Sequence, residues 1–218
     1  MPQLAFQWQL ASSYAPEDFI PSDSNVEALQ FIDSWPANDA KSALIYGGKS
    51  CGKTHLAHRW LGRVGGVMLD ASQLGSLPSE ALWGGASHGV LEDIENIRDE
   101  AALFHLLRGS ETGGRFLLLT ANVPPAQLPF ALPDLRSRLV AMPGAGIAMP
   151  DEQLMTMVMV KWFSDRQLRV GDGVVQYIVN RVERSFSAVF DVIRKIEEVS
   201  LETNRDITVP LVKKVIGG

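Results

Sequence analysis

The sequence predicts an α/β fold in which a parallel sheet flanked by helices is followed by a small all-helical lid domain. In the first two thirds of the chain, short apolar runs alternate with segments of helical periodicity. This alternation is typical of βαβ units whose sheet is buried on both faces. A glycine-rich loop joins the first apolar run to the helix after it. After Pro150 only helical patterns occur, so we expect a domain boundary at 149–150.

The expected elements follow this alternation in order. A short apolar run that ends at a glycine indicates a buried strand at 43–46, and similar runs indicate strands at 67–70, 89–94 and 116–120. Apolar residues at helical spacing, with capping residues or prolines at the ends, indicate the helices. They are expected at 24–31, 54–63, 99–109, 132–139, 151–166, 172–182, 185–202 and 208–216. The resulting segments are an extended tail at 1–18, an α/β domain at 19–149 and a helical lid at 150–218.

Composition excludes several classes of protein. The 218 residues carry 20 Lys and Arg against 25 Asp and Glu, and this net charge of −5 argues against non-specific binding to nucleic acid or anionic membranes. Cys51 is the only cysteine, so no intramolecular disulfide can form, as is usual in a reducing cytosol. No apolar run is long enough to span a membrane, and the N-terminus lacks the pattern of a signal peptide. We therefore expect a cytoplasmic protein that binds no membrane.

The strongest motif follows the first predicted strand and fits G-x-x-x-x-G-K-[ST], the P-loop. Its glycines let backbone N–H groups face phosphates, and the helix N-terminus adds a favourable dipole. Lys53 would face the β- and γ-phosphates of ATP or ADP, and the Thr54 hydroxyl would ligate Mg²⁺. The expected nucleotide-binding residues are Gly47, Gly48, Lys49, Ser50, Cys51, Gly52, Lys53, Thr54 and His55.

Polar residues after two later strands would complete such a site. Glu92 and Asp93 lie at the end of the third predicted strand, where one acid could hold Mg²⁺ and the other orient water, unless they are a surface pair. Asn122 follows the fourth strand and could position water at the γ-phosphate, although asparagine here is often only a turn residue. We expect Thr54, Glu92 and Asp93 as the metal residues.

Two arginines, Arg136 and Arg138, are expected to be exposed on the short helix predicted at 132–139. Such a pair is normally a solvated helix face. In an oligomeric ATPase, however, an arginine of this kind can reach the γ-phosphate of a neighbouring subunit. We therefore treat Arg138 as a candidate catalytic residue that acts in trans.

These motifs, in this order, resemble the AAA+ ATPases and among them the replication initiator DnaA. Gly-Lys-Thr-His-Leu at 52–56 is similar to the P-loop of that subgroup, Leu-Thr-Ala-Asn-Val-Pro-Pro at 119–125 to its sensor I, and Leu-Arg-Ser-Arg at 135–138 to its box VII. The resemblance covers about 19–216. It leaves no residues for the helix-turn-helix domain of DnaA, so it implies no direct sequence-specific DNA binding.

A DnaA-like core without that domain resembles the Hda family, the regulatory inactivators of DnaA. The tail supports the resemblance, because an extended peptide can insert alternate side chains into a hydrophobic pocket. Gln3, Leu4, Phe6 and Trp8 resemble the family's motif for binding the DNA polymerase sliding clamp, although incidental apolar residues in a tail are the alternative. The resemblance implies an adenine-nucleotide-bound regulator of chromosome replication initiation. It would dock on the clamp and stimulate hydrolysis of DnaA-bound ATP, with Arg138 as arginine finger.

The chain departs from the family at two positions. Glu92 stands where the initiator has Asp, and Ser187 aligns with the sensor II arginine of the lid. Arg184 and Arg194 lie about one turn before and two turns after Ser187, so either could face the same way. An autonomous P-loop ATPase or helicase loader is the alternative function, and a homo-oligomer is left open.

Cys51 lies in the loop just before a predicted helix N-terminus. The helix dipole there is expected to lower the pKa of its thiol and make it reactive. The alternative is a small buried residue that only packs.

Overall fold

A five-stranded parallel sheet forms the centre of the larger part of the molecule. The computed structural model describes residues 14–15, 18–36, 40–203 and 205–217. The strand order is β2-β3-β4-β1-β5, and each neighbouring pair is parallel. The strands are β1 (Ser42–Gly47), β2 (Val67–Met68), β3 (His88–Leu91), β4 (Phe116–Ala121) and β5 (Gly144–Ile147). The predicted parallel α/β sheet is confirmed.

Strand β5 was not expected from the sequence. Its residues, Gly-Ala-Gly-Ile, contain almost no branched or aromatic side chains, which are the usual signal of a strand. The glycines are needed because the neighbouring strand is close: a Cβ on Gly144 would lie 2.1 Å from the Leu44 carbonyl oxygen. A Cβ on Gly146 would lie 2.9 Å from the Tyr46 ring. Because β5 lies so close to β1, it needs glycine and lacks the branched and aromatic residues by which a strand is recognised in a sequence.

Strand β3 ends three residues earlier than predicted, at Leu91 rather than Ile94. Asp93 has a φ of 51°, in the left-handed region, and a 3₁₀ turn at Ile94–Asn96 follows. A residue in this conformation cannot continue a strand. Glu92 and Asp93 therefore lie beyond the strand end rather than within it.

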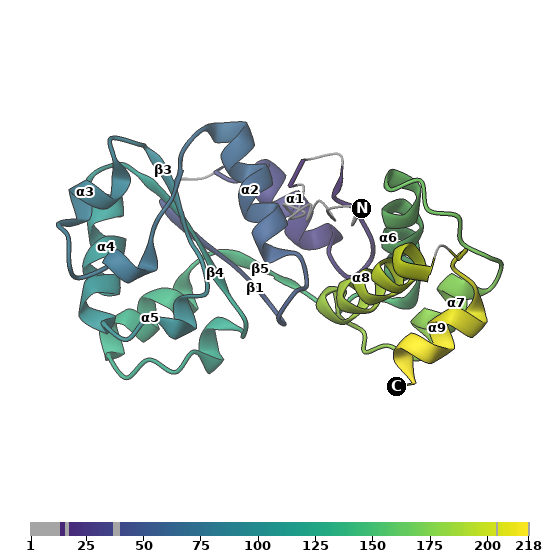
Figure 1. Ribbon diagram of the computed structural model, residues 1–218. Coiled ribbons are helices and arrows are strands. Elements are labelled where there is room, and N and C mark those ends of the chain that lie inside the picture. Colours follow the sequence, from purple (N-terminus) through teal and green to yellow (C-terminus); the bar gives the residue numbers. More distant parts are fainter. Residues whose placement is uncertain (1–13, 16–17, 37–39, 204, 218) are drawn as a thin grey trace.

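Helices cover both faces of the sheet (Figure 1). On one face, α1 (Val26–Ser34) and α2 (Lys53–Val64) pack on Ala43, Ile45 and Leu118. On the other, α3 (Ser79–Trp83), α4 (Glu100–Thr112) and α5 (Pro133–Ala141) pack on Leu44 and Leu119. Neighbouring residues of one strand thus face opposite cores, which is why the apolar runs are continuous. Short 3₁₀ turns also occur at Ala71–Gln73 and Pro125–Gln127.

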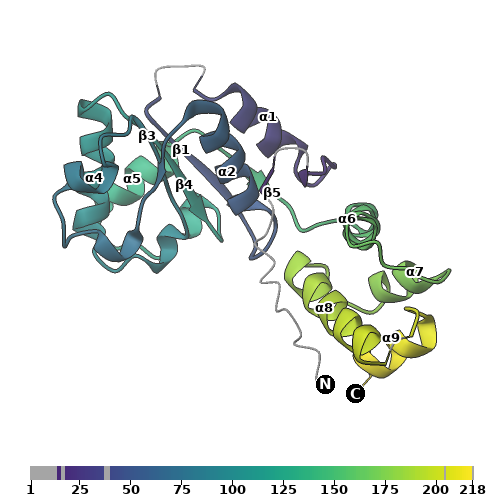
Figure 2. The same cartoon turned by 45° about the horizontal axis from the view of Figure 1, so that its top comes forward.

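The C-terminal part is a helical lid with a core of its own. It contains α6 (Glu152–Asp165), α7 (Val174–Val179), α8 (Phe186–Thr203) and α9 (Val209–Ile216), whose apolar side chains form a separate cluster. The Asp151 carboxylate caps α6 by accepting a 2.6 Å hydrogen bond from the Leu154 N–H. Figure 2 shows the lid set apart from the sheet and joined to β5 by a short connection. The predicted lid is confirmed. Among the described residues, no helix is long and apolar enough to cross a membrane.

An ion pair links the N-terminal segment to the lid. Lys161 on α6 lies with its Nζ 2.9 Å from an Asp18 carboxylate oxygen and 3.1 Å from an oxygen of Asp165, one turn further on. The Lys161 and Asp18 side chains are both partly exposed. The segment before α1 thus contacts the lid as well as the α/β part of the chain.

Candidate functional site

The glycine-rich loop between β1 and α2 is held in a conformation that requires its glycines. Gly52 has a φ of 110°, a conformation that glycine adopts without strain. A Cβ on Gly47 would lie 2.4 Å from the Ile147 carbonyl oxygen and 2.8 Å from Cys51 Sγ. The N-cap residue of α2 is Gly52, which has no side chain to cap the helix. The first N–H groups of α2 are therefore available to an anion, as in other helix N-termini that bind phosphate.

The Lys53 ammonium group lies at the centre of the site. It donates hydrogen bonds to the carbonyl oxygens of Gly47 (2.8 Å) and Gly48 (3.0 Å) and to Asn122 Oδ1 (2.7 Å). The residue is 6% exposed. These contacts use all three N–H donors of the ammonium group. A phosphate bound in the loop would have to take over some of them, because it needs the same donors.

Asn122 is fixed by a residue that the motif analysis did not single out. The Glu95 carboxylate accepts hydrogen bonds from the Asn122 side-chain amide and, at 3.2 Å, from the Asn122 backbone N–H. These contacts orient the amide so that its oxygen faces Lys53. Glu95 reaches Asn122 because the left-handed Asp93 and the 3₁₀ turn bring the chain back towards β4. No feature of the sequence marks such a return, so Glu95 was missed.

The two acids after β3 have different surroundings. Glu92 is partly buried and Asp93 is exposed, and both line a cavity of about 420 Å³ beside the site. The Asp93 backbone N–H donates a 3.0 Å hydrogen bond to Thr120 Oγ1, which ties this turn to β4. The turn therefore lies beside the strand end that carries Asn122.

The expected metal residues suit Mg²⁺ that is shared with a nucleotide. Thr54 lies in the first turn of α2, and its hydroxyl together with carboxylates is the hard oxygen donor set that Mg²⁺ prefers. Within the described part of the chain, no group of three His, Cys, Asp or Glu residues could hold a metal by itself.

Cys51 does not have the expected environment. Its side chain is 2% exposed and belongs to the core between the sheet, α1 and α2. Burial raises the pKa of the thiol, and the smaller opposing effects of the Lys53 charge and of backbone hydrogen bonds do not reverse this. The prediction of a reactive thiol with a lowered pKa was wrong, because loss of solvation outweighs the helix dipole. The alternative, a small residue that packs, is favoured.

We therefore expect Cys51 to react slowly with maleimide at pH 7.5. Both its burial and its raised pKa reduce the amount of accessible thiolate. A Val140→Cys, Cys51→Ala variant supplies an exposed reference thiol, since Val140 is 58% exposed. Labelling followed by mass spectrometry should be at least about tenfold slower at Cys51 than at the reference. Equal rates would contradict the buried environment.

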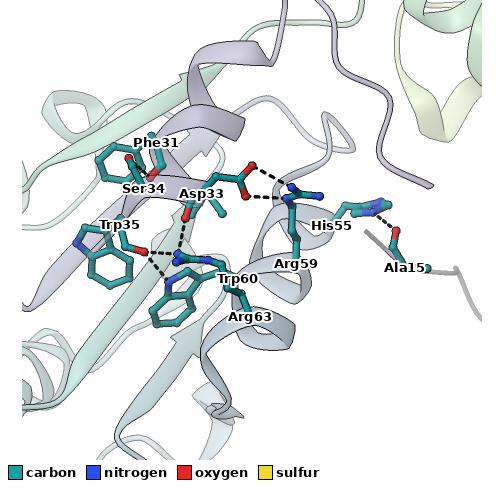
Figure 3. A network of polar contacts seen from close by, with 10 residues as sticks. Ala15, Phe31, Asp33, Ser34, Trp35, His55, Arg59, Trp60 and Arg63 are labelled. Atoms are coloured by element: carbon teal, nitrogen blue, oxygen red, sulfur yellow. Dashed lines mark hydrogen bonds and ion pairs between the residues drawn. The ribbon is translucent and has the colours of Figure 1, made fainter. Parts of the chain in front are cut away.

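His55, expected near the nucleotide, contacts the N-terminal segment. Its Nε2 lies 3.0 Å from the Ala15 carbonyl oxygen (Figure 3). Its ring packs edge-on against Phe19. Burial lowers the pKa of His55, although the contact with Ala15 and the charge of Asp18 act in the opposite direction. Phe19 also approaches the loop, since its ring lies 3.7 Å from where a Cβ on Gly52 would be. Ala15 and Phe19 thus contact α2 at His55, the position directly after Thr54.

A polar network further along α2 fixes α1 against it (Figure 3). Arg59 donates hydrogen bonds of 2.8 and 2.9 Å to the two carboxylate oxygens of Asp33. Arg63 donates to the carbonyl oxygens of Ile32 and Trp35 at the end of α1. These bonds satisfy carbonyls that a helix leaves without an internal partner. These polar contacts therefore hold α2, the helix that begins at Lys53, against α1.

The two arginines of α5 differ. Arg138 donates 2.8 and 2.7 Å hydrogen bonds from Nη1 to the two carboxylate oxygens of Glu111 on α4. Its guanidinium carbon lies 5.4 Å from the centre of the Phe104 ring. Arg136 is exposed on another side of α5 and has no ion pair with the described residues. The expectation that both arginines are exposed is thus correct for Arg136, whereas Arg138 is partly buried.

The lid residues that could respond to a nucleotide lie at and near the start of α8. Ser187 is partly buried, and its hydroxyl lies 3.3 Å from that of Ser185. Arg184 is exposed, and Arg194 makes a loose 3.9 Å contact with Asp191. The contacts of Arg184 and Arg194 with the described residues assign the sensor II role to neither arginine. The expected clamp-binding residues Gln3, Leu4, Phe6 and Trp8 lie outside the described residues.

Comparisons with solved structures show which folds this chain is similar to. Domain III of the replication initiation protein DnaA from Thermotoga maritima superposes with a TM-score of 0.79 at 18% identity, covering 94% of this chain and 95% of that one. AMPPCP-bound DnaA from Aquifex aeolicus gives 0.69 at 19% identity, covering 89% and 68%. The RuvB branch migration motor of T. maritima gives 0.71 at 15% identity, covering 94% and 72%. The fold is that of an AAA+ core with a helical lid.

The lid shows a more specific similarity than the fold as a whole. Residues 151–216 match the family model described as the Hda lid domain. A relative from Haemophilus influenzae, described as an uncharacterized protein, is 27% identical over 86% of this chain and 88% of its own length. The predicted resemblance is thus confirmed for the lid, which matches the Hda lid domain, and for the fold, which is similar to that of DnaA.

Proposed function

We propose that this chain binds an adenine nucleotide with Mg²⁺ in the loop 47–54 and regulates replication initiation by promoting hydrolysis of DnaA-bound ATP. The observation that carries the proposal is the match of the lid to the Hda lid domain on a DnaA-like core. Two of the similar solved structures are DnaA bound to AMPPCP, an adenine nucleotide analogue. The placement of this activity in the cytoplasm follows from the same relationship.

Residues of this chain would bind the nucleotide as follows. Lys53 exchanges carbonyl contacts for the β-phosphate, and the uncapped N–H groups of α2 face the same anion. Thr54, with Glu92 or Asp93, would hold Mg²⁺, which neutralises phosphate charge when bound. Asn122, oriented by Glu95, marks the γ-phosphate side of the site because it contacts Lys53 directly.

Regulation rather than autonomous turnover is supported by the lid. Ser187, at the sensor II position, offers a hydroxyl in place of a guanidinium, so the lid supplies less positive charge to a nucleotide. Stand-alone ATP turnover above about 1 s⁻¹ would favour the alternative of an autonomous ATPase or helicase loader, because that is the ordinary range of enzymes.

Docking on the sliding clamp is expected to depend on the tail alone. Replacing Gln3, Leu4 and Phe6 by alanine should abolish binding to the clamp and leave ADP affinity unchanged, because an extended peptide contributes through its own side chains. The measurement is a pull-down of clamp, and of DnaA–ATP through the clamp on DNA, with wild-type and variant protein.

The structure sets a limit on which residues this test may change. The substitutions must stop before Tyr14, because Tyr14 stacks on His58 at 4.2 Å and belongs to the contacts with α2. Retained clamp affinity after deletion of 1–10 would rule out the motif. Failure of the wild-type protein to bring DnaA–ATP to the clamp would contradict the proposed function.

A further inference from the structure

The face of α4 that receives Arg138 is formed by two residues seven positions apart. Phe104 and Glu111 are separated by two helical turns, so their side chains lie on one stripe of the helix. Arg138 comes from α5 and lies over this stripe, with its guanidinium near the Phe104 ring and its Nη1 on both Glu111 oxygens. The Arg138 side chain is 37% exposed and that of Glu111 44%. The guanidinium is therefore held at the protein surface rather than inside it.

The contact with Glu111 leaves most of the guanidinium available. Only Nη1 is used, and in the described structure Nε and Nη2 make no hydrogen bond. A guanidinium has five N–H donors, so three remain for another group. Nε–H and one Nη2–H point along the same side of the planar group and suit two oxygens of a phosphate.

Another charged residue near this stripe, Arg108, does not pair with Glu111 in place of Arg138. Arg108 is exposed, lies three residues before Glu111 and has its guanidinium carbon 6.0 Å from the centre of the Phe104 ring. Glu111 nevertheless pairs with Arg138 of another helix rather than with this neighbour. The pairing thus fixes the one arginine that the proposed function requires at a defined position.

We infer that Glu111 is a positioning residue: together with the Phe104 ring it orients the Arg138 guanidinium for the γ-phosphate of a nucleotide bound to a second AAA+ subunit. The inference rests on the proposed function. An arginine side chain that is free to rotate spends little time in the productive geometry, and small misplacements of a catalytic group lower rates strongly. Holding one edge by a carboxylate and one face by an aromatic ring reduces that loss while the opposite edge stays free.

The test is single-turnover hydrolysis of ATP pre-bound to DnaA, with clamp on DNA and increasing amounts of each variant. Glu111→Gln keeps the size of the side chain but loses one acceptor and the charge, and should lower the maximal rate about tenfold. The concentration for half-maximal rate should not change, because the docking surfaces are intact. The melting temperature and the effect of ADP on it should also stay at wild-type values.

A double mutant separates positioning from a structural role. In an Arg138→Ala background, Glu111→Gln should cause no further loss, because it acts only through the arginine. Glu80→Gln is the matched control, since Glu80 is also an exposed carboxylate that pairs with an arginine distant in the sequence, Arg115, in the loop before β4. It should leave the rate unchanged.

The outcomes distinguish the inference from the function beneath it. A wild-type rate, or a faster one, with Glu111→Gln would overturn the inference, as would a further loss in the Arg138→Ala background. A wild-type protein that leaves DnaA-bound ATP unhydrolysed would contradict the proposed function, and the inference with it.

Discussion

Lys53→Ala is expected to abolish nucleotide binding. The substitution removes the ammonium group that contacts Gly47, Gly48 and Asn122, where a phosphate would be bound. A ligand that binds only the folded state at 100 times its Kd stabilises that state by about 2.7 kcal/mol. For a chain of this size, such a gain raises Tm by roughly 5–10 °C. ADP should therefore raise the Tm of the wild-type protein and leave that of Lys53→Ala unchanged, as measured by differential scanning fluorimetry.

Lys49→Ala is the matched control for this prediction. Lys49 belongs to the same loop, but it is exposed, whereas Lys53 is buried. Its removal should leave most of the ADP-induced shift in place, because an exposed charge contributes little to a bound phosphate. An equal ADP-induced shift in the wild-type protein and Lys53→Ala would refute the assignment of loop 47–54 as the nucleotide site.

Arg138→Ala is expected to remove the stimulation of ATP hydrolysis by DnaA. An arginine supplied in trans contributes about 10³–10⁵ in rate, equivalent to roughly 4–7 kcal/mol of transition-state stabilisation. Arg138→Lys should restore little, because a point charge lacks the planar fork of the guanidinium. Folding should survive, since exposed ion pairs such as that with Glu111 contribute about 0–1 kcal/mol. Hydrolysis of labelled ATP pre-bound to DnaA, with clamp on DNA, measures the effect.

The adjacent arginine supplies the control. Arg136 lies two residues away on another side of α5, is exposed and lacks the contact with α4. Arg136→Ala should therefore stimulate hydrolysis at the wild-type rate, and both variants should retain ADP and clamp binding. If Arg138→Ala is as active as the wild-type protein, the arginine finger is another residue, and Arg136 or an arginine of the lid becomes the next candidate.

Much of the fold could be predicted because burial on both faces leaves a clear pattern. Strands β1 and β4 are nearly all buried, so they read as continuous apolar runs. Strand β5 escaped because close packing against β1 demands glycine at 144 and 146. Helix α3 is five residues long and begins after Pro78, too short for a helical period to be recognised. Sequence patterns thus identify a helix or strand by the apolar side chains that it buries. They miss an element that is very short or whose residues are dictated by close backbone packing.

The site was predictable to the extent that a motif fixes its backbone. The P-loop pattern and the strand end at Asn122 led to two groups that lie 2.7 Å apart in the structure. The environment of Cys51 was not predictable, because whether a loop side chain turns towards solvent or core depends on α1 and Ile147 packing over it. Glu95 was missed for a similar reason, since its approach to Asn122 depends on the left-handed turn at Asp93.

The ion pair between Asp18 and Lys161 limits how the lid can move. The lid is joined to the α/β part through the connection after β5, and the ion pair adds a further attachment. This attachment removes some of the rotations that a flexible connection alone would allow. Since the pair is partly exposed, salt that shortens the Debye length from about 8 Å at 0.15 M to about 3 Å at 1 M weakens this second attachment. The freedom of the lid to turn relative to the α/β part is therefore expected to increase with ionic strength.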